Sequence, residues 1–215
     1  MTLTGIDAKT DISRLLQLPD WVEFGVLYTA KPEGRNRYPV MEHVSRILTG
    51  LQGRRSSLHV CGAGARLQLL QRELESLTAM VDRIQVNGIM KPLLVEELCQ
   101  QFPEHILITQ HCPKNAELLQ VRAPNHAVLV DGSGGRGIVP RDWFTPITLK
   151  PVGFAGGLSA ATLPVELPKL AKSLCVAGSW VDMESGLRDE HDWFDVLRAA
   201  AAVEICSRWR VDGPA

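Results

Sequence analysis

Short apolar and β-branched runs alternate with amphipathic segments along the whole chain. Runs of roughly four to eight such residues are typical of buried strands, and apolar positions three and four apart are typical of helices. Eight runs are predicted to be strands: residues 2–6, 22–28, 57–61, 83–87, 105–109, 127–131, 152–155 and 179–183. Seven other segments are predicted to be helices: residues 11–18, 40–51, 65–80, 93–101, 115–119, 161–173 and 193–208. The sixth crossover, around residues 141–144, is predicted to be short or irregular.

This number and order of elements indicates the fold class. Eight strands alternating with helices over about 200 residues are expected of a (β/α)8 barrel, an α/β fold. A doubly wound sheet needs only about five or six strands and would leave some segments unexplained. No linker or low-complexity stretch marks a second domain, so residues 1–215 are predicted to form one barrel.

Alternation within the predicted strands assigns side chains to the two faces of the barrel wall. Polar side chains recur on the inward face of several strands. The inward residues include Glu23, Gly25, His59, Cys61, Arg83, Gln85, Asn87, Leu129, Asp131, Trp180, Asp182 and Glu184. Buried polar groups need partners, so Glu23 and Arg83 are predicted to pair in the lower barrel. Polar groups at the strand ends are functional candidates, because barrel active sites lie there.

Composition and charge narrow the class of partner. The formal net charge is −1, which favours neither nucleic acid nor an anionic membrane as the main partner. No apolar stretch approaches the roughly 20 residues of a membrane span, and no signal segment is expected at the N-terminus. Five scattered cysteines form no CxxC pair, so reduced thiols and a cytoplasmic protein are expected. These cysteines are Cys61, Cys99, Cys112, Cys175 and Cys206.

Small-residue loops follow the last three predicted strands and predict an anion site. Gly156-Gly157 follows the seventh strand, and Ser185-Gly186 follows the eighth. Glycine lets backbone N–H groups turn toward a ligand, and barrels often hold phosphate between these two loops. With Gly134 and Gly135 after the sixth strand, these residues form a predicted phosphate cup. The alternative is that these glycines only allow tight turns and bind no ligand.

Two further loops suggest how a ligand would be held and processed. Residues 31–39, after the second strand, carry three cations and could fold over an anionic ligand. A solvated surface loop is the alternative. Asp131 ends the sixth strand and begins the glycine-rich stretch 131–137, which makes it a candidate general base.

Taken in order, the motifs of this chain resemble those of phosphoribosylanthranilate isomerase. That family's opening strand reads Lys-Ile-Cys-Gly-Ile, and its later signatures include Val-Gln-Leu-His-Gly, Gly-Gly-Leu and Val-Asp-Val-Ser-Ser-Gly-Val. The matching segments here are Leu3-Thr4-Gly5-Ile6, Phe24-Gly25-Val26-Leu27-Tyr28, Arg37-Tyr38, Ile84-Gln85-Val86-Asn87-Gly88, Asp131 with Gly134-Gly135-Arg136-Gly137 and Asp142-Trp143, Ala155-Gly156-Gly157-Leu158, and Val181-Asp182-Met183-Glu184-Ser185-Gly186-Leu187.

The resemblance implies an Amadori rearrangement of an aminoaldose phosphate to an aminoketose, without metal or cofactor. The family's acid is the cysteine of its first strand, and its base is the aspartate after strand six. Asp131 matches the base, whereas Thr4 stands at the position of the acid. A threonine hydroxyl has no pKa near neutrality and does not readily replace a thiol acid. Asn87 replaces a histidine of the family, and Glu184 replaces a serine.

These departures leave three hypotheses open for the activity. The first is a diverged isomerase or related acid–base enzyme acting on a phosphorylated sugar or nucleotide-like ligand. The second is a true phosphoribosylanthranilate isomerase that uses another acid, such as Cys61, His59 or His111. The third is a barrel that binds a ligand or a protein without turnover. A zinc site could be built from His59, Cys61, His111, Cys112 and Asp131, but no ligand spacing supports it, and no metal is expected.

The predicted site residues fall into three groups. The catalytic candidates are Asp131, Thr4, His59 and Cys61. The substrate-binding candidates are Gly5, Arg37, Gln85, Asn87, His111 and Glu184. The phosphate-binding candidates are Gly134, Gly135, Gly156, Gly157, Ser185 and Gly186. The expected partner is a phosphorylated small molecule, with no cofactor, and the protein is expected to be a monomer or homodimer.

Overall fold

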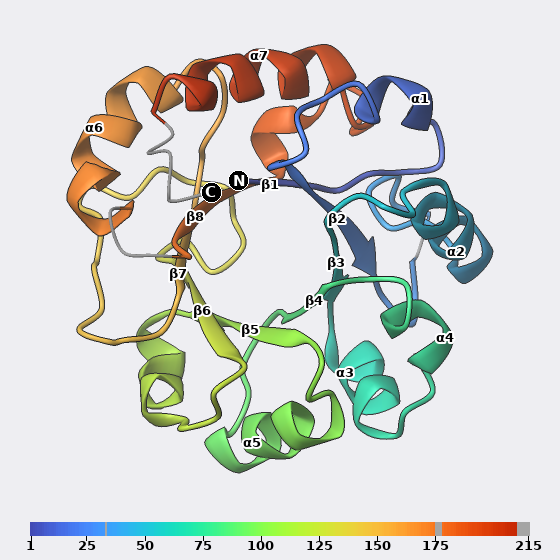
Figure 1. Ribbon diagram of the computed structural model, residues 1–215, viewed down its shortest axis with the longest axis vertical. Coiled ribbons are helices and arrows are strands. Elements are labelled where there is room, and N and C mark those ends of the chain that lie inside the picture. Colours follow the sequence, from blue (N-terminus) through green and yellow to red (C-terminus); the bar gives the residue numbers. More distant parts are fainter. Residues whose placement is uncertain (33, 175–177, 210–215) are drawn as a thin grey trace.

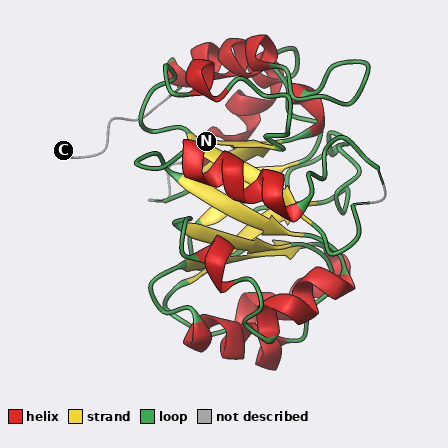
Figure 2. Ribbon diagram, turned by 90° about the vertical axis from the view of Figure 1, so that its right-hand side faces the viewer, coloured by secondary structure: helices red, strands yellow, loops and turns green. Residues whose placement is uncertain are grey.

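The computed structural model describes residues 1–32, 34–174 and 178–209. Its strands close into a parallel barrel in chain order, from β1 to β8 and back to β1. The strands form the central ring and the helices surround it (Figure 1). Seen from the side, helices cover the strands above and below (Figure 2). The predicted fold class is therefore confirmed. Cys175 and residue 33 of the predicted loop 31–39 lie outside the described residues.

Each predicted strand is present, with shifts of one or two residues at most ends. The strands are β1 Thr2–Thr4, β2 Glu23–Tyr28, β3 Ser56–Val60, β4 Arg83–Val86, β5 Ile106–His111, β6 His126–Asp131, β7 Val152–Ala155 and β8 Trp180–Met183. The helices are α1 Ile12–Leu15, α2 Met41–Gly50, α3 Ala63–Leu70, α4 Glu75–Thr78, α5 Pro92–Gln101, α6 Leu163–Leu174 and α7 Val196–Ser207, with 3₁₀ helices η1 Pro113–Gln120 and η2 Ser185–Leu187.

Three helix predictions need correction. The single helix expected over 65–80 is two helices, because Arg72 takes a left-handed conformation with φ 62° between α3 and α4. The segment 115–119 lies within a 3₁₀ helix that is kinked at Asn115. The last helix starts after Asp195, whose carboxylate caps the N–H groups of Leu197 and Arg198. The sixth crossover contains no helix or strand, as predicted.

Two hydrophobic clusters reflect the two faces of the barrel wall. The larger one fills the layer between strands and helices. The smaller one lies inside the barrel and joins Ile108, Ala127, Leu129 and Trp180, with Ala155 packed against it. This inner cluster closes the space beneath the strand ends.

Charged groups are also paired inside the lower barrel. Arg83 Nη1 lies 3.1 Å from Glu23 Oε2, as predicted, and its guanidinium stacks 4.0 Å from the centre of the Trp180 ring. Thr2 donates to the same carboxylate at 3.0 Å. The Glu23 carboxylate therefore has two partners in the lower barrel, whereas Arg83 Nε, Arg83 Nη2 and Trp180 Nε1 are buried there without a hydrogen-bond partner among the described residues. Polar groups in the upper barrel face the cavity.

Candidate functional site

A small cavity lies at the C-terminal ends of the strands. Its volume of about 60 Å³ holds a handful of water molecules. Polar side chains and backbone turns make up most of its wall. It is lined by Thr4, His59, Gln85, Asn87, Gln110, Leu129, Asp131, Gly135, Gly137, Ala155, Gly157, Leu158, Asp182, Met183, Glu184, Ser185 and Gly186.

The structure brings ten of the predicted site residues into this wall. They are Thr4, His59, Gln85, Asn87, Asp131, Gly135, Gly157, Glu184, Ser185 and Gly186. The other six lie outside it: Gly5, Arg37, Cys61, His111, Gly134 and Gly156. Gly134 and Gly156 are next to lining residues, and the other four are held elsewhere by contacts described below.

His59 is held as a neutral ring. Its Nδ1 lies 3.1 Å from Gln85 Nε2, and its Nε2 lies 3.1 Å from Ser57 Oγ. Burial, with Arg83 nearby, lowers the pKa of His59 to about 3. Gly25 makes room for this arrangement, because a Cβ there would lie 2.6 Å from Thr4 Oγ1 and 2.9 Å from His59 Nε2. Both ring nitrogens have partners, so His59 positions the wall of the cavity and is not free to exchange protons.

Cys61 and His111 do not join the central cavity. Cys61 lines a second cavity with Lys31, Arg35 and Tyr38. Burial raises the pKa of its thiol to about 12, and its Sγ accepts from Asn87 Nδ2 at 3.3 Å.

His111 is at the end of β5, where its ring stacks on Phe144 with the ring centres 5.2 Å apart. In the alternation of this strand, Gln110 is the residue that faces the cavity. The predicted strand ended at residue 109, which is why Gln110 was missed.

Asp131 is buried and accepts hydrogen bonds at both carboxylate oxygens. Ser133 donates to Oδ1 from its backbone N at 3.0 Å and from its Oγ at 2.7 Å. Gln110 and the Gly135 backbone donate to Oδ2 at 2.9 and 2.5 Å. Four donors fill the acceptor sites of a carboxylate. Asp131 can take a proton from a ligand only after one of these donors moves away.

Asp182 is the titratable group that the sequence analysis did not single out. It was assigned to the inward face of the last strand, but no role was attached to it. Its side chain is buried in the cavity wall, and Thr4 Oγ1 donates to its Oδ1 at 2.6 Å. Burial raises the pKa of Asp182 to about 7, Thr4 and Arg83 lower it, and Glu184 and Glu23 raise it further. A buried carboxyl that titrates near neutrality is a candidate proton donor.

The loops of the predicted phosphate cup pack against one another through glycines. A Cβ on Gly157, which has φ +61°, would lie 2.4 Å from the backbone nitrogen of Val139. A Cβ on Gly186 would lie 2.2 Å from the carbonyl oxygen of Leu158. Neither Gly137 nor Gly157 donates its backbone N–H to another described residue. Close packing explains the glycines, and these two N–H groups are available beside the cavity.

The neighbouring side of the mouth, beyond β8, is a charged network of Asp7, Arg37, Glu184, Arg188 and Asp192, here called the clasp. Arg37 donates to Glu184 at 2.8 Å and to both oxygens of Asp192 at 3.0 and 2.6 Å. The hydrogen bonds that Arg37 donates to Asp192 raise the pKa of Arg37 above its ordinary value. Burial raises the pKa of Glu184, and Arg37 opposes this shift. Arg37 is therefore engaged by two carboxylates and does not reach the cavity.

The second arginine of the clasp, Arg188, is buried. It connects the loop after the last strand to the loop after the first strand. Arg188 Nη1 lies 3.0 Å from Asp7 Oδ2 and 2.7 Å from the Asp192 carbonyl oxygen. Its Nη2 donates to the Gly5 carbonyl oxygen and occupies the space where a Gly5 side chain would lie.

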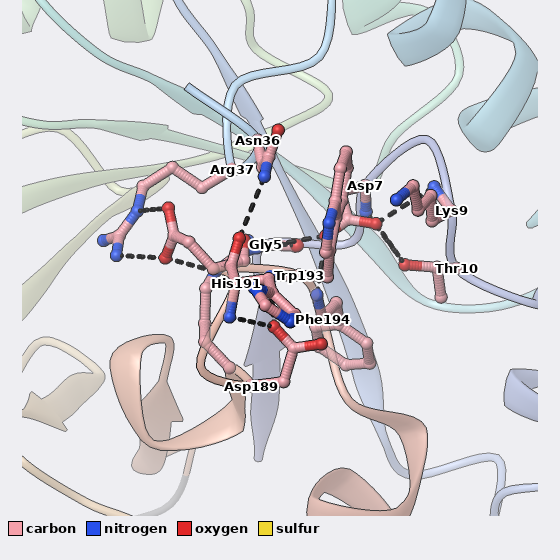
Figure 3. Close-up of polar contacts among 12 residues, drawn as sticks. Gly5, Asp7, Lys9, Thr10, Asn36, Arg37, Asp189, His191, Trp193 and Phe194 are labelled. Atoms are coloured by element: carbon pink, nitrogen blue, oxygen red, sulfur yellow. Dashed lines mark hydrogen bonds and ion pairs between the residues drawn. The ribbon is translucent and has the colours of Figure 1, made fainter. Parts of the chain in front are cut away.

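The loop around the clasp is ordered by further hydrogen bonds from both ends of the chain (Figure 3). Asp7 also accepts from Phe194 N at 2.6 Å, and Asn36 donates to the His191 carbonyl oxygen at 2.9 Å. The clasp thus ties the loops after β1, β2 and β8 together.

Within residues 1–32, 34–174 and 178–209, no three His, Cys, Asp or Glu side chains are grouped to hold a metal ion. None of the helices in that part of the chain is long and apolar enough to cross a membrane.

Comparison with known proteins shows the fold. No protein-family model matches the chain, and no curated protein matches it. Among solved structures, it is similar to phosphoribosyl anthranilate isomerase from Thermus thermophilus, with 19% identity, coverage of 97% of this chain and 98% of that one, and a TM-score of 0.65.

Two further structures extend this comparison. A phosphoribosyl anthranilate isomerase in complex with reduced 1-(o-carboxyphenylamino)-1-deoxyribulose 5-phosphate gives 15% identity, 96% and 97% coverage, and a TM-score of 0.64. A 3-hexulose-6-phosphate synthase gives 11% identity, 95% and 98% coverage, and a TM-score of 0.60. At these identities the likeness establishes a shared barrel over nearly the whole chain.

Proposed function

We propose that this barrel binds a phosphorylated sugar derivative at the C-terminal ends of its strands and isomerises it from aldose to ketose, as a diverged relative of phosphoribosylanthranilate isomerase. One observation carries the proposal. The same cavity wall contains glycine turns with available N–H groups and two buried carboxyl groups, Asp131 and Asp182. One isomerase neighbour is in complex with a reduced deoxyribulose 5-phosphate derivative, and another neighbour is a 3-hexulose-6-phosphate synthase. Both descriptions support the ligand class.

The turns after β6, β7 and β8 form the phosphate end of the proposed site. Available backbone N–H groups in such turns bind anions without a charged side chain. Gly137 and Gly157 supply two of them, and Ser185 adds a hydroxyl at the rim. A phosphate held there would lie beside the loop 131–137, which also supplies three donors, from Ser133 and Gly135, to Asp131.

Asp131 is the proposed base for the proton on C2 of the sugar. Its donors Ser133 and Gly135 belong to the loop that would contact the phosphate. When the phosphate attracts these N–H and O–H groups, a lone pair of Asp131 becomes available. Ligand binding and activation of the base are thereby coupled.

Binding without turnover is the second candidate function. Two observations favour it: Thr4 stands where the resembling family has its acid, and all acceptor sites of Asp131 are filled. Reduced thiols, a cytoplasmic location, a monomer or homodimer, and the absence of a cofactor stay predictions.

The experiment combines turnover with binding. The protein is incubated with the condensation product of ribose 5-phosphate and anthranilate, and formation of the ketose is followed. Asp131→Asn is expected to lower kcat by about 10²–10⁴-fold while inorganic phosphate still raises the Tm. The control is Asp20→Asn, because that side chain is fully exposed. Unchanged turnover in Asp131→Asn excludes this base, and a phosphate-induced rise in Tm without wild-type turnover favours binding alone.

A further inference from the structure

The charges around the central cavity restrict the kind of ligand that can fill it. Three carboxyl groups line the cavity, those of Asp131, Asp182 and Glu184. Among the described residues no lysine or arginine lines it, and His59 has a partner at each ring nitrogen. A second anionic group on the ligand would therefore meet only negative or neutral side chains. This inference rests on the proposed function, because it concerns the part of the same ligand that lies away from the phosphate.

We propose that Glu184 is a specificity-determining residue, which selects sugar phosphates whose nitrogen substituent is neutral or cationic over those whose substituent carries a carboxylate. Glu184 lines the cavity directly after β8. Its Oε1 accepts a hydrogen bond from Arg37 Nη1 at 2.8 Å, whereas its Oε2 accepts none from another described residue. One oxygen of this carboxylate is therefore left for a donor on the ligand.

The side chain of Glu184 reaches away from the phosphate cup. Its partner Arg37 belongs to the loop after β2, and the Arg37 guanidinium also donates to both oxygens of Asp192. Burial raises the pKa values of Tyr38 and Cys61 to about 12, and the charge of Glu184 contributes to both shifts. Tyr38 lies in the same loop as Arg37, and Cys61 directly follows β3. A phosphate in the cup lies after β6, β7 and β8, so Glu184 would face the part of the ligand that extends toward β2 and β3.

The clasp does not neutralise the charge of Glu184. Its acidic members are Asp7, Glu184 and Asp192, whereas its basic members are only Arg37 and Arg188. Arg37, the cation predicted to contact the ligand, is shared between two of these carboxylates. A carboxylate on the ligand would thus meet a net negative charge, whereas an amide N–H or an ammonium group would be attracted to it.

The binding test uses two stable analogues that differ by one charge. Reductive amination of ribose 5-phosphate with anthranilate or with 2-aminobenzamide gives phosphoribityl aryl amines of nearly the same shape, one with a carboxylate and one with a neutral amide. In titration calorimetry at low salt, the wild type is expected to bind the amide about tenfold more tightly or better. The preference is expected to shrink at high salt, because salt screens the repulsion.

Two variants locate the source of this preference. Glu184→Gln removes the charge and keeps an oxygen that can accept from Arg37, so it is expected to bind the two analogues with similar Kd. Glu190→Gln is the matched control, because Glu190 is exposed and lies outside the cavity. It is expected to keep the preference of the wild type. Equal Kd values in the wild type, tighter binding of the carboxylate, or an unchanged preference in Glu184→Gln would overturn the role of Glu184.

A turnover measurement separates this inference from the proposed function. The ribosylamine phosphates of anthranilate and of 2-aminobenzamide are compared by kcat/KM, and the wild type is expected to favour the amide by about tenfold or more. Equal kcat/KM values with turnover of both compounds overturn the selection alone. Binding of both analogues without turnover of either compound overturns the proposed isomerisation, and the ratio of the Kd values then decides the role of Glu184. If neither analogue binds, the proposed ligand class and the selection are overturned together.

Discussion

The two sides of the cavity mouth are formed by different chemical groups, backbone turns on one side and charged side chains on the other. The cup side, after β6, β7 and β8, consists of backbone turns packed through glycines. The clasp side, after β1, β2 and β8, consists of charged side chains that pair across large sequence separations. Backbone turns depend on local conformation, whereas the clasp depends on residues at both ends of the chain. Backbone donors in the first kind of site do not depend on the identity of a side chain, whereas one substitution in the second kind removes an ion pair.

The largest expected effect comes from opening the clasp at its buried arginine. Arg188→Met leaves the carboxylate of Asp7, which is fully buried, without its cation. Breaking a buried ion pair from one side destabilises a protein by about 3–5 kcal/mol. Urea unfolding measures this loss. Arg208→Met, which removes an exposed pair with Glu204, is expected to change stability by less than about 0.5 kcal/mol. Equal losses in the two variants would show that the clasp does not support the fold.

An intermediate effect is expected from adding one methyl group to the cup. Gly157 and Gly134 both have a positive φ, which strains any other residue. A methyl group added at Gly157 would also collide with the backbone of Val139, whereas one added at Gly134 would lie in open space. Gly134→Ala is expected to lose about 1–2 kcal/mol, and Gly157→Ala about 1–3 kcal/mol more. Only Gly157→Ala should lose the rise in Tm caused by inorganic phosphate. Loss of that rise in both variants would mean that loop strain, rather than the cup, controls binding.

The smallest expected effect comes from Glu184, the residue at which the clasp and the cup adjoin. Glu184 belongs to the clasp but lines the cavity, so its charge opposes an anion in the cup. Glu184→Gln is expected to tighten phosphate binding about two- to threefold at low salt, and less at high salt. Its stability should change by less than about 1 kcal/mol. Glu190→Gln, outside the cavity and exposed, is the control for calorimetric titration. Weaker phosphate binding in Glu184→Gln would show that this carboxylate orders the cup.

The barrel could be predicted from the sequence because its signals are local and repeated. Eight apolar runs with alternating faces indicated the closed sheet, and the alternation also indicated that Glu23 and Arg83 pair in the lower barrel. The break after α3 could not be predicted in this way. Arg72 takes a left-handed conformation there without a glycine or proline nearby to signal it.

The site was predictable in part for the same physical reason. Glycine pairs at strand ends marked the cup, and Asp131 marked the end of β6. The burial and the partners of each titratable side chain could not be predicted from the sequence, because they depend on contacts between strands. Burial changes Asp182 into a carboxyl that titrates near neutrality, and two carboxylates engage Arg37, which was expected to contact the ligand.

The clasp also constrains the order of events during folding. Asp7 meets Phe194 across 187 positions of the chain, and Arg188 meets Asp7 across 181. Contacts of such separation form late, because the intervening chain must first be ordered. During synthesis, the first six strands leave the ribosome before Arg188 exists. The nascent barrel therefore has no finished pocket until its last strand has closed the ring.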